Sequence, residues 1–333
     1  MSNNKKAFFF PGQGAQTVGM GRQLLESSEH VRKLFSRASE LADTDLEAVV
    51  LNGPEECLNS TRLSQPAIFV LSMAVLDELG RRYHNRYDSQ VRAESFGRSL
   101  PTVAAAGLSL GEYSALVFAG SLEFEDALRI VVARGRFMQE ACDETPGGMT
   151  SLMGLESHQV EEAVQQAGSH GAVGISNYNS PVQTVISGEK EAVAEATRIA
   201  KDLGCRRAVE LRVAGAYHSS LMASATKKLR PMLDEVSISA PRCPFYSNFT
   251  GARVEDPDQI REGLARQVEC SVRWVEIVEA VKADGAEGGV EVGPGRVVAG
   301  LVKNIDRSLG VTSICEPESI ESLIQVDGVG VTA

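Results

Sequence analysis

The Gly-x-Ser-x-Gly motif at residues 107–111 sets the narrowest limits on the fold of this chain. A short apolar run at 102–106 precedes the motif, and residues 113–119 are apolar at helical spacing, which predicts a strand, a tight turn and a helix. At such a junction the serine lies on a strained turn, its hydroxyl exposed and the nearby backbone amides directed at an anion. Ser109 is therefore the candidate nucleophile. The alternative is chance, because the chain has 31 glycines in 333 residues.

Residues 147–213 have a pattern of their own. They alternate as strand, helix, strand, strand, helix and strand, the order of a ferredoxin-like unit, and we expect a small subdomain inserted in a larger α/β core. Residues 81–100 are polar, carry five arginines and lack periodicity, so a solvated excursion is predicted there. Residues 311–333 are predicted to form a C-terminal tail, with little pattern from Glu316 on apart from a short apolar stretch.

Composition excludes several function classes. The net charge of −11 argues against nucleic acid as a partner, and the absence of a run of about 18 apolar residues argues against a membrane span. No signal-peptide core follows the N-terminus, so a cytoplasmic protein or a processed mature form is expected. The cysteines lack metal-ligand spacing, which predicts free thiols and no zinc site. They are Cys57, Cys142, Cys205, Cys243, Cys270 and Cys315.

A glycine-rich turn at 11–16 follows the predicted strand 7–10. It does not match a phosphate-binding loop, because the Gly-Lys-Ser/Thr ending is absent and Thr17 replaces the third glycine of Gly-x-Gly-x-x-Gly. Small residues here let backbone amides approach another group closely, with Gln13 at the apex. A plain strand-to-helix turn is the alternative interpretation.

Arg134 lies out of place in the predicted helix 123–138. It shares a face with Ile130 and Val131, and no acid stands three or four residues away. A guanidinium in an apolar stripe needs an anion, either a distant carboxylate in an ion pair or a bound ligand.

Earlier in the chain, residues 61–66 are predicted to form a turn before a helix at 67–79. Gln65 there is either a cap or a polar group facing a cleft.

His218 is the best candidate for a general base among the five histidines. It stands between small and apolar residues at a predicted strand-to-helix junction, whereas the other four are expected to be exposed. Two of them lie among charged residues, one near a helix start and one in a glycine-flanked loop: His30, His84, His158 and His170. A general base must be held by its surroundings close to the nucleophile. A buried structural histidine is the alternative.

Several motifs, taken in order, resemble those of malonyl-CoA:acyl carrier protein transacylases over residues 7–306. The resemblance implies an α/β-hydrolase-like core with a mostly parallel sheet at 1–146 and 214–310, and a ferredoxin-like subdomain at 147–213. These motifs are Pro11-Gly12-Gln13-Gly14, Gln65-Pro66, Gly107-x-Ser109-Leu110-Gly111-Glu112-Tyr113, Arg134-Gly135-x-Phe137-Met138-Gln139, Asn177-x-Asn179-Ser180-Pro181, Gly215-Ala216-Tyr217-His218-Ser219, Gln267 and Glu291-Val292-Gly293-Pro294-Gly295.

The resemblance also implies catalytic roles. Ser109 corresponds to the family's nucleophile and His218 to its base, and the main-chain carbonyl at Gln267 corresponds to the group that orients this histidine. The oxyanion hole corresponds to the backbone amides of Gln13 and Leu110. No triad acid is then required.

Three further residues correspond to substrate-binding positions. Arg134 would hold the malonyl carboxylate, and Gln65 and Asn179 would line the pocket. Two departures from the family pattern stand out. Leu108 occupies a position where histidine is usual, and Cys270-Ser271 replaces Asn or Ser followed by Pro.

The implied activity is transfer of malonyl from malonyl-CoA to the phosphopantetheine thiol of acyl carrier protein through a malonyl-serine ester, at the start of fatty acid synthesis. No cofactor and no metal is expected, and the protein is expected to be a monomer in the cytoplasm, or in the plastid stroma if it is a mature plant-type form. A trans-acting malonyl transferase of polyketide synthesis and a serine thioesterase or hydrolase are the alternatives. Lys227, Lys228 and Arg230 could meet an acidic carrier.

Overall fold

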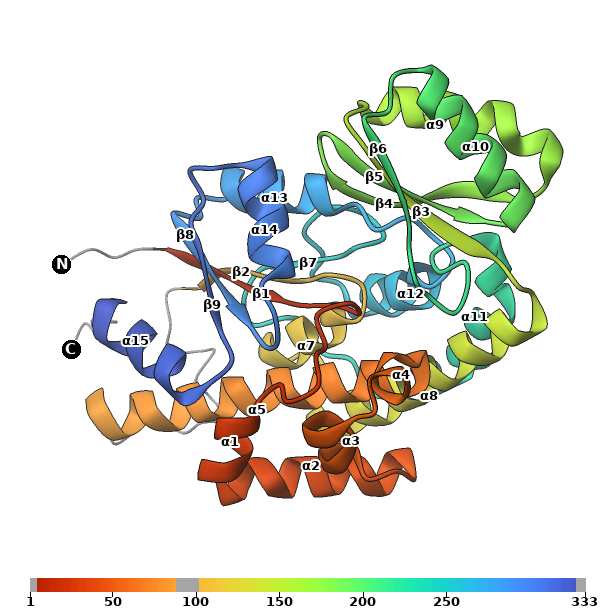
Figure 1. The fold of residues 1–333 in the computed structure, drawn as a ribbon. Helices are drawn as coiled ribbons and strands as arrows, with labels where there is room; N and C mark the ends of the chain where they lie inside the picture. The colour runs from red at the N-terminus through yellow and green to blue at the C-terminus, as the bar shows by residue number, and fades with distance from the viewer. Residues whose placement is uncertain (1–4, 88–101, 328–333) are drawn as a thin grey trace.

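The computed structural model describes residues 5–87 and 102–327. A five-stranded parallel sheet with strand order β7-β2-β1-β8-β9 forms the centre of the molecule (Figure 1). Its central strand is β1, and the Ser109 motif follows β2. The strands are β1 (Lys6–Phe10), β2 (Thr102–Gly107), β7 (Phe245–Tyr246), β8 (Gly288–Val292) and β9 (Val311–Ile314).

Both faces of the sheet are buried, and β1 shows how. Phe8 and Phe10 pack against Phe118 on one face, whereas Phe9 meets Trp274 on the other. Because successive strand side chains point to opposite faces, this run of phenylalanines serves two cores. The first core includes α5 (Thr61–Tyr87), α7 (Gly111–Phe118) and α8 (Phe124–Glu144), and the second includes α13 (Trp274–Ala283) and α14 (Val297–Ile305).

The remaining helices of the large subdomain contribute buried side chains to the first core. Helix α13 is preceded by a separate helix that ends at Gln267, with a break near residue 270 between the two. The remaining helices are α1 (Arg22–Ser27), α2 (Glu29–Ala42), α3 (Leu46–Asn52), α4 (Glu55–Asn59), α11 (Ala223–Glu235), α12 (Pro257–Gln267) and α15 (Pro317–Asp327), with a 3₁₀ turn η3 (Ser220–Met222) ahead of α11.

A second, antiparallel sheet with order β4-β5-β3-β6 lies beside the main one, covered by α9 and α10 (Figure 1). This is the predicted ferredoxin-like order, so the fold class is confirmed. The subdomain limits 147–213 remain a prediction. The elements are β3 (Gly148–Met153), α9 (Ser157–Ala167), η2 (Gly168–His170), β4 (Val173–Ser180), β5 (Gln183–Gly188), α10 (Lys190–Asp202) and β6 (Arg207–Glu210).

Two predictions around α5 were wrong. The predicted turn at 61–66 is the start of this helix, with Pro66 inside it, and residues 81–87 continue the helix instead of leaving it. Pairs four residues apart, Arg81 with Asp77 and Arg82 with Glu78, support the polar end, a pattern that apolar periodicity does not reveal. The rest of the predicted excursion, 88–100, lies outside the described residues.

Helix α5 is also the one described helix long and apolar enough, by length and composition, to cross a membrane. The qualifying segment is Thr61–Tyr83, and 78% of its most apolar window is buried inside the protein. Burial of this kind is typical of the core helix of a globular protein.

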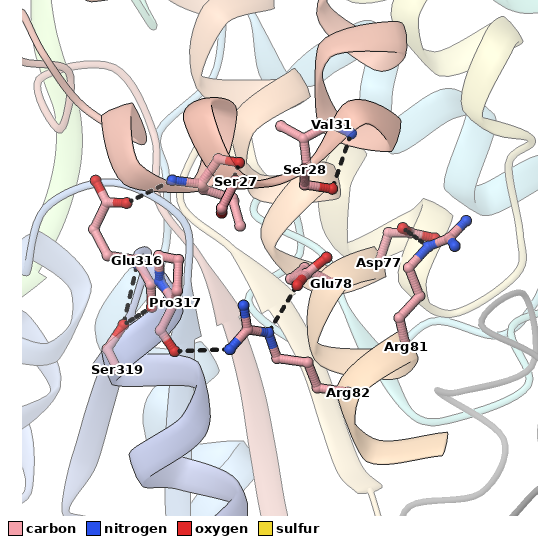
Figure 2. A network of polar contacts seen from close by, with 11 residues as sticks. Ser27, Ser28, Val31, Asp77, Glu78, Arg81, Arg82, Glu316, Pro317 and Ser319 are labelled. Carbon is pink, nitrogen blue, oxygen red and sulfur yellow. Dashed lines mark hydrogen bonds and ion pairs between the residues drawn. The ribbon is translucent and has the colours of Figure 1, made fainter. Parts of the chain in front are cut away.

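The segment predicted as a C-terminal tail belongs to the core over its described part. Strand β9 pairs in parallel with β8, and α15 packs after it. Figure 2 shows how the start of α15 is held: the Arg82 guanidinium donates to the Pro317 carbonyl, and Glu316 accepts from the backbone amide of Leu24 at 3.1 Å. Four-residue strands and long-range caps leave little pattern in a sequence, which explains the missed elements.

Candidate active site

The turn between β2 and α7 has the strained geometry that its motif predicted. Ser109 has a φ of 50°, in the left-handed region that disfavours non-glycine residues. A Cβ at Gly107 would overlap the backbone of Gly111, and a Cβ at Gly111 would overlap the carbonyl of Phe10. The two glycines therefore allow the strand, the turn and the first glycine-rich loop to approach closely enough to present the serine.

His218 completes a dyad with Ser109. Its Nε2 lies 2.8 Å from Ser109 Oγ, and its Nδ1 lies 2.7 Å from the main-chain carbonyl of Gln267. Because a carbonyl only accepts hydrogen bonds, Nδ1 carries the proton and Nε2 is left to accept from the serine hydroxyl. His218 also has a positive φ, 56°, and its amide donates to the Val268 carbonyl.

Burial, and next the Arg134 charge, lowers the pKa of His218 to about 4. The imidazole is therefore neutral near pH 7, the form that takes a proton from a serine. The main-chain carbonyl of Gln267, predicted from the family resemblance to orient this histidine, lies in hydrogen-bond contact with Nδ1. No carboxylate is in contact with His218 within residues 5–87 and 102–327.

Arg134 on α8 is buried beside the serine, at 1% exposure. Its Nη2 donates to Ser109 Oγ at 3.1 Å and to Gln267 Oε1 at 2.9 Å, and its Nη1 donates to Gln65 Oε1 at 2.6 Å. All three acceptors are neutral, Nε has no partner, and burial lowers the pKa of the guanidinium. Within the described chain Arg134 forms no ion pair, so of the two anions considered from the sequence a bound ligand is favoured.

The first glycine-rich loop meets the Ser109 turn, as the oxyanion-hole prediction requires. The amide of Leu108 donates to the carbonyl of Phe10 at 3.0 Å, and a Cβ at Gly12 would overlap the Leu108 carbonyl. Over the described ranges, the backbone amides of Gln13 and Leu110 have no acceptor. Both are thus free to stabilise an oxyanion.

The predicted pocket residues differ in position. Gln65 is fully buried and contacts Arg134, with its amide nitrogen 3.5 Å from Gln13 Oε1. Asn179 lies on β4 and makes no hydrogen bond to Ser109 or Arg134 in the described part of the chain; its Oδ1 is buried without a partner. Its role in substrate binding remains a prediction.

A pocket of about 310 Å³ opens beside His218 and contains the unusual Cys270-Ser271 pair. Ser271 Oγ donates to the Ile175 carbonyl at 2.5 Å, and the next amide donates to the Ser176 carbonyl. This departure from the family pattern thus ties the segment after Gln267 to strand β4. The pocket is lined by Val173, Gly174, Ile175, His218, Ser219, Ser220, Glu269, Cys270 and Ser271.

The basic group proposed for carrier docking is largely neutralised within the protein. Lys228 pairs with Glu140 and Glu144, and Arg230 pairs with Asp234 and Glu262. Cations that already have carboxylate partners attract an acidic protein weakly, so the structure gives this docking hypothesis little support.

Sequence reasoning missed two buried residues that hold the serine turn. Asn248 Oδ1 accepts from the Ser109 amide at 2.6 Å, and Asn248 Nδ2 donates to the Gly107 carbonyl at 2.7 Å. Glu112 accepts from the Asn248 amide at 3.1 Å and from the Gln267 side chain. Glu112 was visible inside the motif, whereas Asn248 follows a two-residue strand and had no local signal.

This chain resembles known proteins over almost its whole length. The model of the acyl transferase domain family matches residues 7–317. The malonyl CoA-acyl carrier protein transacylase of Bacillus subtilis is 36% identical over 323 residues, 97% of either chain. The crystal structure of malonyl-CoA:acyl carrier protein transacylase from Xanthomonas oryzae has a TM-score of 0.87 at 35% identity, covering 98% of this chain and 99% of its own. A malonyl-transacylase in complex with a type II polyketide acyl-carrier protein has a TM-score of 0.87 at 36% identity, covering 96% and 99%.

Proposed function

This chain belongs to the acyl transferase family, among the malonyl-CoA:acyl carrier protein transacylases, and we propose that it moves malonyl from malonyl-CoA to the phosphopantetheine thiol of acyl carrier protein. One observation carries the choice of acyl group. The buried Arg134 donates to the serine hydroxyl and has only neutral acceptors in the described structure. A carboxylated acyl group on Ser109 would supply the missing anion, and an alkyl chain would not.

The proposed reaction follows from the dyad. His218 Nε2 takes the Ser109 proton as Oγ attacks the thioester carbonyl, and the amides of Gln13 and Leu110 stabilise the oxyanion. Collapse of the intermediate breaks the carbon–sulfur bond, and the protonated imidazole returns its proton to the leaving thiolate of coenzyme A. The carrier thiol then repeats these steps on the malonyl-serine ester.

The proposal extends to pathway, partner and location. The relative in complex with a polyketide carrier makes a polyketide pathway the second candidate to fatty acid synthesis. Kinetics with carriers from the two pathways will separate them. We also propose a cytoplasmic monomer that needs no cofactor, with acyl carrier protein as its partner. All six cysteines are free thiols, which suits a reducing compartment.

Intact-mass measurement with a panel of acyl-CoAs tests the proposal. We expect malonyl-CoA alone to leave one stable malonyl adduct on the wild-type protein, and carrier protein to remove it. Ser109→Ala, which lacks the nucleophile, will carry no adduct and will lose about 10⁴-fold or more of the rate. Rapid release of free malonate without transfer to the carrier would support a hydrolase instead, and an equal adduct from fatty acyl-CoA would contradict the role of Arg134.

A further inference from the structure

Glu112 is a buried carboxylate that the proposed reaction does not use. It is 1% exposed and lies in the first turn of α7, three residues after the nucleophile. Its Oε1 accepts from the Asn248 amide at 3.1 Å, and its Oε2 accepts from Gln267 Nε2. A carboxyl group is seldom kept in such a place without partners, and here both oxygens have one.

The contact with Gln267 decides which way that side chain points. A carboxylate only accepts, so the amide nitrogen of Gln267 must face Glu112, and this leaves Oε1 to accept from Arg134 Nη2 at 2.9 Å. The same nitrogen also donates to the Ser109 carbonyl at 2.8 Å. The reversed amide would present a donor to a guanidinium, which has no acceptor of its own.

The protonation state of Glu112 depends on its surroundings. Burial raises the pKa of Glu112 to about 7, while its hydrogen bonds and the Arg134 charge lower it, and the Glu112 charge in turn favours the protonated guanidinium. The other titratable groups nearby are Tyr113 on the same helix, whose pKa burial raises to about 12, and His218 beyond Gln267. Once ionised, above about pH 7, Glu112 is therefore the carboxylate that faces Arg134 across the Gln267 amide before an acyl group arrives.

We propose that Glu112 is a positioning residue for acyl selectivity, acting through the Gln267 amide to hold Arg134 where it receives the carboxylate of the acyl group. The proposal rests on the proposed malonyl transfer. It predicts that a change at Glu112 harms malonyl transfer more than acetyl transfer, because an acetyl group has no carboxylate for the guanidinium. The orientation of His218 does not depend on the Gln267 side chain, since Gln267 holds His218 through its main chain.

Glu112→Gln tests the proposal, with rates of Ser109 acylation by malonyl-CoA and acetyl-CoA as the readout. The new amide places a donor against Gln267, which turns and no longer supports Arg134. We expect the malonyl-to-acetyl ratio of kcat/KM to fall about tenfold, the effect of one charge-assisted hydrogen bond. An equal loss for both substrates would overturn the proposal, because it would make Glu112 only a support for the serine turn.

Glu291→Gln is the matched control. Glu291 is another fully buried glutamate, and it accepts from the amides of Val298 and Ala299 at the start of α14 and from Ser313. Its replacement is expected to lower the melting temperature and leave the malonyl-to-acetyl ratio at the wild-type value. A wild-type enzyme without malonyl preference would contradict the proposed function itself, before any variant is compared.

A double-mutant cycle checks the route through Gln267. Gln267→Met removes the amide and keeps the main-chain carbonyl, so we expect it to lower the ratio about as much as Glu112→Gln, and the double variant to be no worse than either. Losses that multiply in the double variant would overturn the proposal. If Glu112→Gln does not fold, Glu112→Asp takes its place, because its carboxylate is withdrawn from Gln267 by one methylene. We expect Glu112→Asp to lower the malonyl-to-acetyl ratio, and an unchanged ratio would overturn the proposal.

Discussion

The dyad and the arginine, two neighbouring parts of one site, are held in different ways. Ser109 and His218 both stand at positive φ, and the second nitrogen of His218 contacts a main-chain carbonyl. Arg134 is held by the side-chain oxygens of Gln65 and Gln267. Backbone partners remain after a side chain is replaced, whereas side-chain partners do not. The chemistry should therefore withstand changes that alter the choice of acyl group.

Arg134→Ala is expected to change the choice of acyl group most strongly while the Ser109–His218 dyad keeps its activity. Malonyl transfer should fall about 100- to 1,000-fold, because two charge-assisted hydrogen bonds to the acyl carboxylate are lost, while acetyl transfer should rise. Rates of acylation with the two coenzyme A esters give the comparison. Arg129→Ala, on the exposed side of the same helix, is the control and should change neither rate. Equal losses of malonyl and acetyl transfer would mean that Arg134 has a structural role and that the dyad and the arginine cannot be altered separately.

A smaller, unselective effect is expected from Asn248→Ala. The Ser109 amide and the Gly107 carbonyl would both lose their partner, so the serine turn should relax and transfer of malonyl and acetyl should fall together, about 10- to 100-fold. Steady-state kinetics and a melting curve measure the two consequences. Thr250→Ala, in the same loop but exposed, serves as the control. A change in the malonyl-to-acetyl ratio would show that the turn and the arginine are coupled.

The smallest effect expected is a shift in acid sensitivity. Protonated His218 cannot accept the serine proton, so wild-type kcat/KM for acetyl-CoA, which does not depend on Glu112, should stay level down to about pH 5 and fall about tenfold per unit below about pH 4. Since the Arg134 charge contributes to this low pKa, the acid limb of Arg134→Ala acting on acetyl-CoA should move to higher pH. Brief exposure to each pH before assay guards against unfolding. An acid limb at the same pH in both proteins would mean that burial alone lowers the pKa of His218.

Much of the site was predictable from the sequence because its candidate catalytic residues lie in short motifs. Ser109 with its flanking glycines, His218 between small residues and Arg134 in an apolar stripe each stand out locally, and the structure brings the three within hydrogen-bond reach. The alternation of elements in 147–213 likewise predicted the ferredoxin-like unit that contains the small sheet. Their catalytic roles remain proposals that the experiments above test.

The sequence by itself determined the elbow, the succession of strands and helices in the small subdomain and the candidate dyad, because these depend on backbone freedom and periodicity over a few residues. Only the tertiary structure decided that Arg134 forms no ion pair within residues 5–87 and 102–327 and that the Gln267 amide lies between Glu112 and Arg134, since these partners lie far apart in the chain. It also decided that α5 runs through Pro66 and that β9 joins the sheet, where burial and long-range pairing outweigh local propensity.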